Sequence, residues 1–199
     1  MRVGPTGGFK QPIVSAMDTI GSYECQEHVV LLGEEYQVIG TAPKLEAHER
    51  GLLHRAFSTF VVNTLGEIRM QGRAVVNYHS PGCWSNTCCG HPRRGEAALA
   101  APHRRLEEEM GFDCGLRPAG VFQYRARVEP GLIEHEIDHL FVAVCNEMPV
   151  PNPAEVSDWT YVPPPTLSRC LSEKPSEFTA WLPYAFAHVR NHLSVVTQL

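Results

Sequence analysis

Histidines and glutamates that could bind a metal ion occur in separate segments of the sequence. His48 and His54 lie close together, and His91 follows a Cys-Gly pair. Glu134 and Glu136 lie in a strand-like segment, where side chains at positions i and i+2 point to the same face and can reach one cation. Three imidazoles and two carboxylates would suit six-coordinate Mg²⁺, Mn²⁺ or Zn²⁺, although a single histidine more often has no metal role. Six others we interpret as ordinary surface or core histidines: His28, His79, His135, His139, His188 and His192.

A second candidate lies in a charged segment that we expect to form a helix, Glu96–Met110. Glu108 and Glu109 share one face of this helix, and two carboxylates there suit a hard cation such as Mg²⁺ bridged by diphosphate oxygens. The run RRLEEE alone would be typical of a solvated helix face. However, the segment from Gly90 reads G-x5-E-x7-R-R-L-x-E-E-x-G-F, which resembles the Nudix box, G-x5-E-x7-R-E-U-x-E-E-x-G-U, where U is apolar. Only Arg105 departs from it, because the box has glutamate at that position.

The loop before this helix carries a more specific pattern. Residues 80–96 read SPGCWSNTCCGHPRRGE. They are similar to the signature loop of the type 1 isopentenyl-diphosphate isomerases, which reads roughly S-K-x-T/A-W-P-G-x-W-T/S-N-S/T-x-C-G-H-P-x-x-G-E. Arginine in place of the box glutamate is also typical of that family, which belongs to the Nudix superfamily. The chain is therefore identified as a divergent member, and the resemblance extends from about Glu27 to the C-terminus, including LHRAFS, QYRA and GLIEHE.

The resemblance implies a pair of groups that move protons. Cys89 matches the family's catalytic cysteine, and Glu136 matches the opposing acid–base group, which also binds the metal. Tyr124 matches a tyrosine that is hydrogen-bonded to this glutamate. Trp181 matches an indole whose π-face would stabilise carbocation character at the reacting carbons. The family's His3Glu2 metal site is matched by His48, His54, His91, Glu134 and Glu136, and a ligand of a second, substrate-associated Mg²⁺ is matched by Glu109.

The part of the sequence that should bind the diphosphate departs from the family pattern. Asn77 stands where the family has a phosphate-binding lysine, Ser80 where it has tryptophan, and Gly72 where it has another arginine. Losing one charged contact to a phosphate costs about 1.5–3 kcal/mol, or roughly tenfold to hundredfold in affinity. The cations that still match phosphate-binding positions are Lys44, Arg73 and Arg105.

The elements that must position these residues predict an α/β (α+β) fold. We expect a Nudix-like mixed β-sheet layered between helices, formed by one domain over residues 27–199 after an N-terminal extension, residues 1–26. The expected elements are two short strands in Glu27–Gly40, two in Ala56–Ala74, a loop over Asn77–Pro92, the helix Glu96–Met110, strands Val121–Val128 and His135–Cys145, a loop-rich connection Pro151–Pro165, and a C-terminal helix Ser176–Val196 carrying Trp181.

The amino-acid composition limits the kinds of molecule that the protein can bind. A net charge of -5 argues against nucleic acid, which requires a basic surface, but permits a small prenyl diphosphate held by local cations and a metal. No apolar stretch approaches the length of a membrane helix, and the first residues lack a signal-peptide core, so we expect no membrane span and a cytoplasmic location. The sequence does not report the oligomeric state.

Four functions are compatible with these patterns. The first is isomerisation of isopentenyl diphosphate to dimethylallyl diphosphate, and the second is related proton chemistry on a larger prenyl substrate, for example proton-initiated cyclisation. A Nudix diphosphohydrolase is the third, with Arg105 counting against it. A non-catalytic protein that keeps the fold is the fourth, opposed by the full set of metal ligands and acid–base groups.

Overall fold

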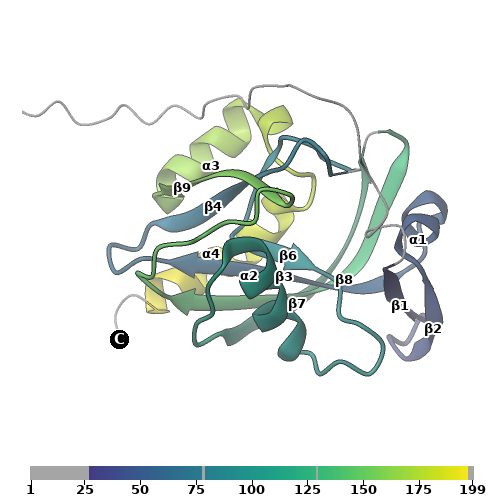
Figure 1. The fold of residues 1–199 in the computed structure, drawn as a ribbon. Helices are drawn as coiled ribbons and strands as arrows, with labels where there is room; N and C mark the ends of the chain where they lie inside the picture. Colours follow the sequence, from purple (N-terminus) through teal and green to yellow (C-terminus); the bar gives the residue numbers. More distant parts are fainter. Residues whose placement is uncertain (1–26, 78, 129, 197–199) are drawn as a thin grey trace, which may run out of the picture.

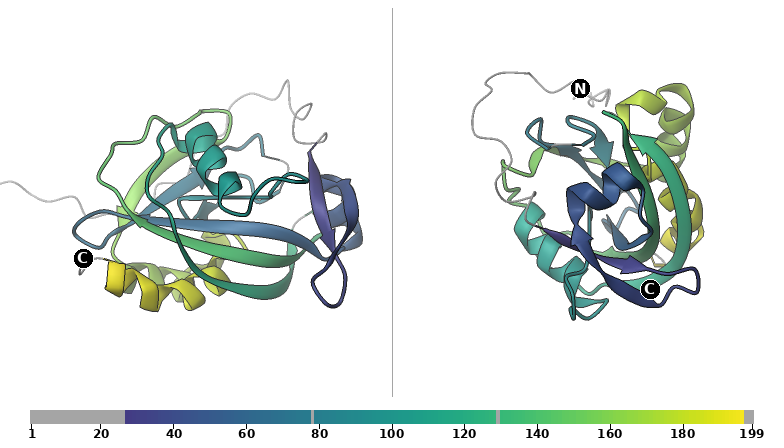
Figure 2. Two further views of the ribbon diagram at one scale, coloured as in Figure 1. Left: turned by 90° about the horizontal axis from the view of Figure 1, so that it is seen from below. Right: turned by 90° about the vertical axis from the view of Figure 1, so that its right-hand side faces the viewer.

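The computed structural model describes residues 27–77, 79–128 and 130–196. The expected N-terminal extension, residues 1–26, lies outside the described residues, so the domain boundary at residue 27 stays a prediction. The described residues form a mixed nine-stranded sheet with helices on both of its faces (Figures 1 and 2). The expected layered α+β architecture is therefore confirmed.

The centre of the sheet is a parallel pair of long strands. Strand β3 (His54–Val62) pairs with β8 (Leu132–Val144), and β7 (Arg117–Val128) is antiparallel to β8. The register of the parallel pair sets His54 directly opposite Glu136. Two predicted metal ligands that are far apart in the sequence are thereby fixed side by side. The other strands are β1 (His28–Leu32), β2 (Val38–Pro43), β4 (Ile68–Arg73), β5 (Trp84–Ser85), β6 (Cys88–Gly90) and β9 (Val156–Val162).

The two faces of β3 are covered by different helices. Phe57 and Val61 pack in one apolar cluster with residues of α2, whereas Phe60 and Val62 pack in another with residues of α4. This alternation follows from the two-residue repeat of a strand, and each buried aromatic or aliphatic side chain stabilises the fold by about 1.5–3 kcal/mol. Figure 2 shows α2 and α4 on opposite sides of the sheet. The helices are α1 (Lys44–Arg50), α2 (Ala100–Met110), α3 (Pro164–Glu173) and α4 (Leu182–Val196), with a short 3₁₀ helix at Pro175–Glu177.

Helix α2 is shorter than the sequence suggested. It begins at Ala100 instead of Glu96, so Pro102 lies in its first turn, where a missing N–H leaves no hydrogen bond unmade. It ends at Gly111, whose φ of 69° is left-handed. A Cβ at this glycine would come within 2.3 Å of the carbonyl oxygen of Val150, so the chain requires glycine here.

Several other boundaries differ from the expectation. Strands β5 and β6 lie within the expected loop Asn77–Pro92, and β9 and the start of α3 lie within or beside the expected connection Pro151–Pro165. The prolines before α3 concealed a helix, because its first turn tolerates proline. Trp181 lies just before α4 instead of within the helix. None of the helices in the described part of the chain is long and apolar enough to cross a membrane.

Candidate functional site

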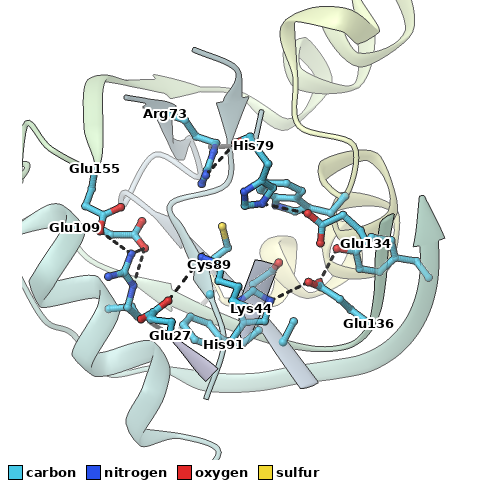
Figure 3. A pocket seen from close by; sticks show the side chains of 17 residues that line it. Glu27, Lys44, Arg73, His79, Cys89, His91, Glu109, Glu134, Glu136 and Glu155 are labelled. Atoms are coloured by element: carbon cyan, nitrogen blue, oxygen red, sulfur yellow. Dashed lines mark hydrogen bonds and ion pairs between the residues drawn. The ribbon is translucent and has the colours of Figure 1, made fainter. Parts of the chain in front are cut away.

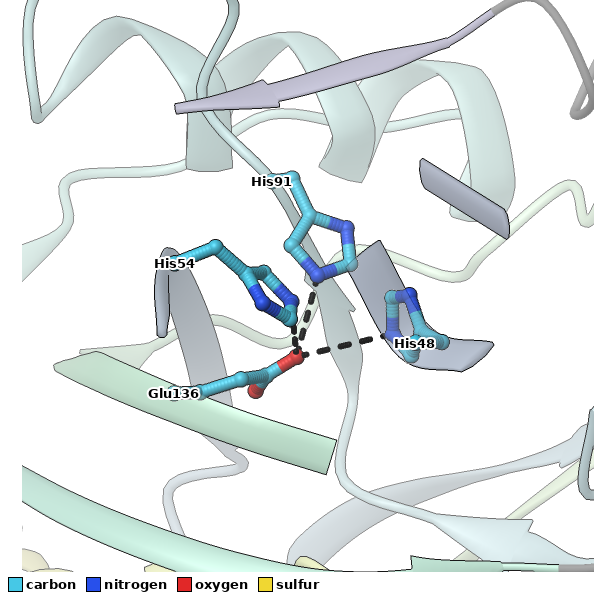
Figure 4. A group of neighbouring side chains, drawn as sticks. All are labelled: His48, His54, His91 and Glu136. Carbon is cyan, nitrogen blue, oxygen red and sulfur yellow. Dashed lines mark hydrogen bonds and ion pairs between the residues drawn. The ribbon is translucent and has the colours of Figure 1, made fainter. Parts of the chain in front are cut away.

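Three histidines converge on one carboxylate oxygen (Figure 4). Oε1 of Glu136 lies 3.1 Å from Nε2 of His54 and 3.0 Å from Nε2 of His91. Nε2 of His48 lies 4.0 Å from the same oxygen. One ligand atom from each of the four side chains lies within 4.8 Å of every other. The structure thus brings together four of the five residues predicted to form the first metal site.

Backbone hydrogen bonds to two of the imidazoles leave Nε2 of each ring as the nitrogen that could bind a metal ion. Nδ1 of His48 lies 2.7 Å from the carbonyl oxygen of Lys44, and Nδ1 of His54 lies 2.8 Å from that of Leu52. Each Nδ1 therefore donates its proton to a carbonyl, and the remaining ring nitrogen, Nε2, could bind a metal ion. An octahedral ion with bonds of about 2.1 Å sets neighbouring ligand atoms about 3.0 Å apart, which agrees with the closest spacings. This donor set fits a divalent metal ion.

The fifth predicted ligand, Glu134, lies between two histidines. Its Oε2 is 3.4 Å from Nε2 of His48, and its Oε1 is 3.1 Å from Nε2 of His79. Burial opposes the charged carboxylate, but the hydrogen bonds of these two imidazoles outweigh it and hold the pKa of Glu134 well below its ordinary range. Burial lowers the pKa of His79 to about 4, so its ring is neutral at pH 7. His79, which the sequence pattern indicated to be an ordinary histidine, is therefore part of the cluster.

Beside this cluster lies a cavity of about 40 Å³, with room for roughly three water molecules (Figure 3). Cys89 and Glu136 both line it. The spatial requirement for a proton-transfer pair, that thiol and carboxylate open on a common cavity, is met. His48 and His54 are fully buried beside the cavity and reach it through the glutamates that they contact. The other predicted site residues in the cavity wall are Lys44, Arg73, His91, Arg105, Glu109, Tyr124, Glu134 and Trp181.

The two acid–base candidates hold their protons more tightly than free side chains do. Burial raises the pKa of the Cys89 thiol to about 12, and the charge of Glu109 adds to this. Burial and the charge of Glu134 raise the pKa of Glu136. The hydroxyl of Tyr124 donates to Oε2 of Glu136 at 2.6 Å, which fixes the carboxylate. Both groups therefore favour their protonated forms more than the free side chains do.

An asparagine that the sequence analysis did not single out holds the indole in place. Nε1 of Trp181 donates to Oδ1 of Asn86 at 3.1 Å, and the Asn86 amide donates to the carbonyl oxygens of Thr59 and Cys88. Asn86 is fully buried, so these bonds are not exchanged with water. The indole is thereby tied to β3 and to β6, the strand that carries Cys89. Only the hydrogen-bond network, which has no sequence signature, reveals this role.

Comparisons with known proteins agree with this arrangement. The NUDIX domain family matches residues 52–182. The isopentenyl-diphosphate Delta-isomerase of Burkholderia multivorans is 48% identical over 78% of this chain and 89% of its own. That of Pectobacterium atrosepticum is 42% identical over 82% of this chain and 92% of its own. The chain belongs to the isopentenyl-diphosphate Delta-isomerase family of NUDIX-domain proteins.

Solved structures support the fold of this isomerase family member. DR0079 from Deinococcus radiodurans has a TM-score of 0.68 at 17% identity, covering 81% of this chain and 99% of that protein. The MutT protein from Methanosarcina mazei has a TM-score of 0.56 at 15% identity, covering 70% of this chain and 94% of that protein. At such identities the similarity shows the fold alone, and the expected Nudix-like fold is confirmed.

The cations that match the family's phosphate-binding positions are already engaged. Arg105 lies 2.8 Å from Glu109 and 3.2 Å from Glu155, and these charges outweigh burial to raise its pKa further. Lys44 lies 3.6 Å from Glu27. The cavity wall thus carries more carboxylates than cations, so its charge would oppose an anion that enters without accompanying positive charge. The acidic residues in the cavity wall are Glu27, Glu109, Glu134, Glu136 and Glu155.

The loop that departs from the family pattern also changes the cavity. Asn77 is buried, and its amide lies 3.5 Å from the backbone oxygen of Glu155. Neither Asn77 nor Ser80 is in the cavity wall, but His79 is, at a position where the family pattern has threonine or alanine. The loop therefore lines the cavity with an imidazole and not with a phosphate-binding lysine.

Within the Nudix box, Glu96 fastens the preceding loop to α2. Arg104 donates to both of its oxygens, at 2.8 and 3.1 Å, and the backbone N–H of Arg93 donates at 2.7 Å. The Arg104 bonds hold the pKa of Glu96 below its ordinary value of 4.5, against a smaller opposing effect of burial. The role of Glu96 in the described structure is thus to support the loop that carries His91.

We expect Glu96→Gln to lower the free energy of unfolding at pH 7 by about 1 kcal/mol, after allowing for solvent screening. A carboxyl whose pKa is depressed by folding contributes stability above its unfolded pKa and loses it as the pH falls. The difference between the variant and the parent protein should therefore shrink below pH 4.5. Urea unfolding at a series of pH values measures this difference in the free energy of unfolding. The substitution Glu107→Gln, at an exposed position, is the control. An equal difference at every pH would contradict this account.

Proposed function

We propose that the protein is an isopentenyl-diphosphate Delta-isomerase that interconverts isopentenyl and dimethylallyl diphosphate. The observation that carries this proposal is the common cavity of Cys89 and Glu136. The curated isomerases that are 42–48% identical to the chain support it.

The reaction needs one proton added and one removed. One member of the pair Cys89 and Glu136 gives a proton to the terminal alkene carbon, and the other removes a proton from C2, so the double bond moves and the composition stays the same. Tyr124 keeps Glu136 oriented through its hydrogen bond. The Trp181 π-face, fixed by Asn86, stabilises positive charge on the carbon skeleton between the two transfers.

A divalent metal fits the cluster of histidines and glutamates. We propose that it is Mg²⁺, Mn²⁺ or Zn²⁺, and that a second Mg²⁺ at Glu109 accompanies the diphosphate. A donor set rich in imidazole favours a transition metal at the first site, whereas carboxylate and phosphate oxygens favour Mg²⁺ at the second. When bound, the metals supply positive charge that offsets the carboxylates and the diphosphate. The proposed ligands of the first site are His48, His54, His91, Glu134 and Glu136.

We expect removal of the metal by a chelator to lower the melting temperature. An ion that binds only the folded protein at about 100 times its Kd adds about 2.7 kcal/mol of stability, so its loss should be readily visible. Differential scanning calorimetry after EDTA treatment, and again after adding Mn²⁺, Zn²⁺ or Mg²⁺ in excess, measures this effect. An unchanged melting temperature under all these conditions would remove the metal site from the proposal.

The activity is tested by incubating the protein with C5, C10, C15 and C20 prenyl diphosphates in D₂O with Mg²⁺. Deuterium should enter the C5 products, because each turnover exchanges one carbon-bound proton. A larger prenyl substrate is the second candidate function, favoured by the changed loop at Asn77 and Ser80. Deuterium confined to a longer product would establish that candidate and reject the C5 isomerase. Release of phosphate without deuterium incorporation would instead indicate a diphosphohydrolase.

A further inference from the structure

We propose that His79 supports the proposed metal site without binding the metal itself. His79 holds the ligand Glu134 in position by contacting the carboxylate oxygen that does not bind the metal. This inference rests on the proposed metal site. His79 would be a positioning residue that belongs to this chain's altered loop, and it would add a fourth histidine to the centre. Its effect would be on the affinity for the metal ion.

The two oxygens of Glu134 face different partners. Oε2 lies 3.4 Å from Nε2 of His48, on the side of the proposed metal, and Oε1 lies 3.1 Å from Nε2 of His79. Because a carboxylate oxygen only accepts, we infer that Nε2 of His79 carries a proton directed at this oxygen. Glu134 therefore presents Oε2 to an ion, while Oε1 faces the imidazole of His79 as its ion-pair partner.

A second metal ion between His48, His79 and Glu134 is the competing interpretation. These three side chains also offer ligand atoms within 4.8 Å of one another. However, Nδ1 of His48 is bonded to the carbonyl oxygen of Lys44, so His48 has only Nε2 to offer. One lone pair binds one ion, and we assign that ion to the group with His54, His91 and Glu136, because this group offers four ligands and the other offers three. Two ions sharing His48 are thus excluded, which leaves His79 the role of hydrogen-bond donor.

The surroundings of His79 make it a rigid donor. Its ring centroid lies 5.8 Å from that of Trp181 and 5.4 Å from that of His48, and the residue is only 5% exposed. Its carbonyl oxygen accepts a hydrogen bond from Arg73 at 3.3 Å. His79 therefore connects the metal cluster with the indole wall and with a predicted phosphate-binding arginine. Loss of such a hydrogen bond from a metal ligand typically weakens metal affinity tenfold to hundredfold.

The test compares two substitutions of similar volume. His79→Gln keeps an N–H donor, whereas His79→Leu keeps the bulk and loses the donor. Mn²⁺ and Zn²⁺ dissociation constants are measured by competition with a chromogenic chelator. We expect Leu to weaken binding about tenfold to hundredfold and Gln to restore most of the loss. His139→Leu, a histidine on β8 outside the cluster, should bind metal like the parent protein. Circular dichroism and melting of the metal-free variants exclude misfolding as the cause.

A double-mutant cycle links the effect to Glu134. If His79 acts through this carboxylate, His79→Leu should weaken metal binding far less in a Glu134→Gln background than in the parent. X-ray absorption of the Zn²⁺-loaded protein should count three imidazole ligands with and without His79. Four imidazoles, full additivity in the cycle, or unchanged affinity in His79→Leu would each overturn this proposal. Absence of metal binding in the parent protein would instead reject the metal site itself.

Discussion

Cys89→Ser is expected to abolish isomerase turnover, with a loss of about 10²–10⁴-fold or more. A serine hydroxyl has nearly the same size as the thiol but is a weaker acid, so it gives up its proton less readily even than this buried thiol, whose pKa burial raises to about 12. Deuterium incorporation from D₂O into the C5 diphosphate measures the rate. The metal content and the melting temperature should stay unchanged.

The matched control for Cys89→Ser is Cys83→Ser in the same loop. Cys83 is also a free, partly buried cysteine, but it is not among the residues that line the cavity. It should therefore keep the parent rate. Substantial turnover in Cys89→Ser, or an equal loss in Cys83→Ser, would remove Cys89 from the proton-transfer pair.

Glu136→Gln is expected to have the second large effect, because it removes two functions together. Oε1 of Glu136 faces the nitrogens of His54 and His91, and Oε2 accepts the hydroxyl of Tyr124. The amide cannot accept a carbon-bound proton and is a weak metal ligand. We therefore expect turnover to fall by at least about 10³-fold and metal affinity by at least about tenfold.

An assay at saturating metal separates the loss of proton transfer from the loss of metal affinity. Turnover is assayed at metal concentrations high enough to saturate the variant, so that any remaining deficit reports proton transfer alone. Glu107→Gln, an exposed glutamate of α2, serves as the control for charge. If saturating metal returned Glu136→Gln to the parent rate, Glu136 would be a metal ligand without a role in proton transfer.

The sequence predicted the layered fold and most of the strand positions because alternation and glycine turns have local signatures. It failed for β9 and α3, where prolines concealed an edge strand and the first turn of a helix. The ends of α2 show both outcomes: the stop at Gly111 was predicted, but the start at Ala100 depended on a loop whose hydrogen bonds to Glu96 have no local pattern.

For the site, motifs predicted which residues to consider, and only the fold showed how they meet. His54 and Glu136 lie side by side because of the parallel register of β3 and β8, which no local pattern reveals. His79 was missed for the same reason. Its partner Glu134 lies on a strand far along the chain, and the family pattern has no histidine at this position.

The parallel pairing of β3 with β8 also sets the time at which a metal can be captured during synthesis. His54 precedes its carboxylate partner Glu136 by 82 residues. At a translation rate of 5–20 residues per second, the ribosome adds this segment in about 4–16 s. During that interval the nascent histidines have no glutamate opposite them, and non-local strands pair slowly once both have been made. Binding of the proposed metal would therefore be among the last events of maturation, and a chain that stops before β8 would lack the carboxylate half of the proposed site.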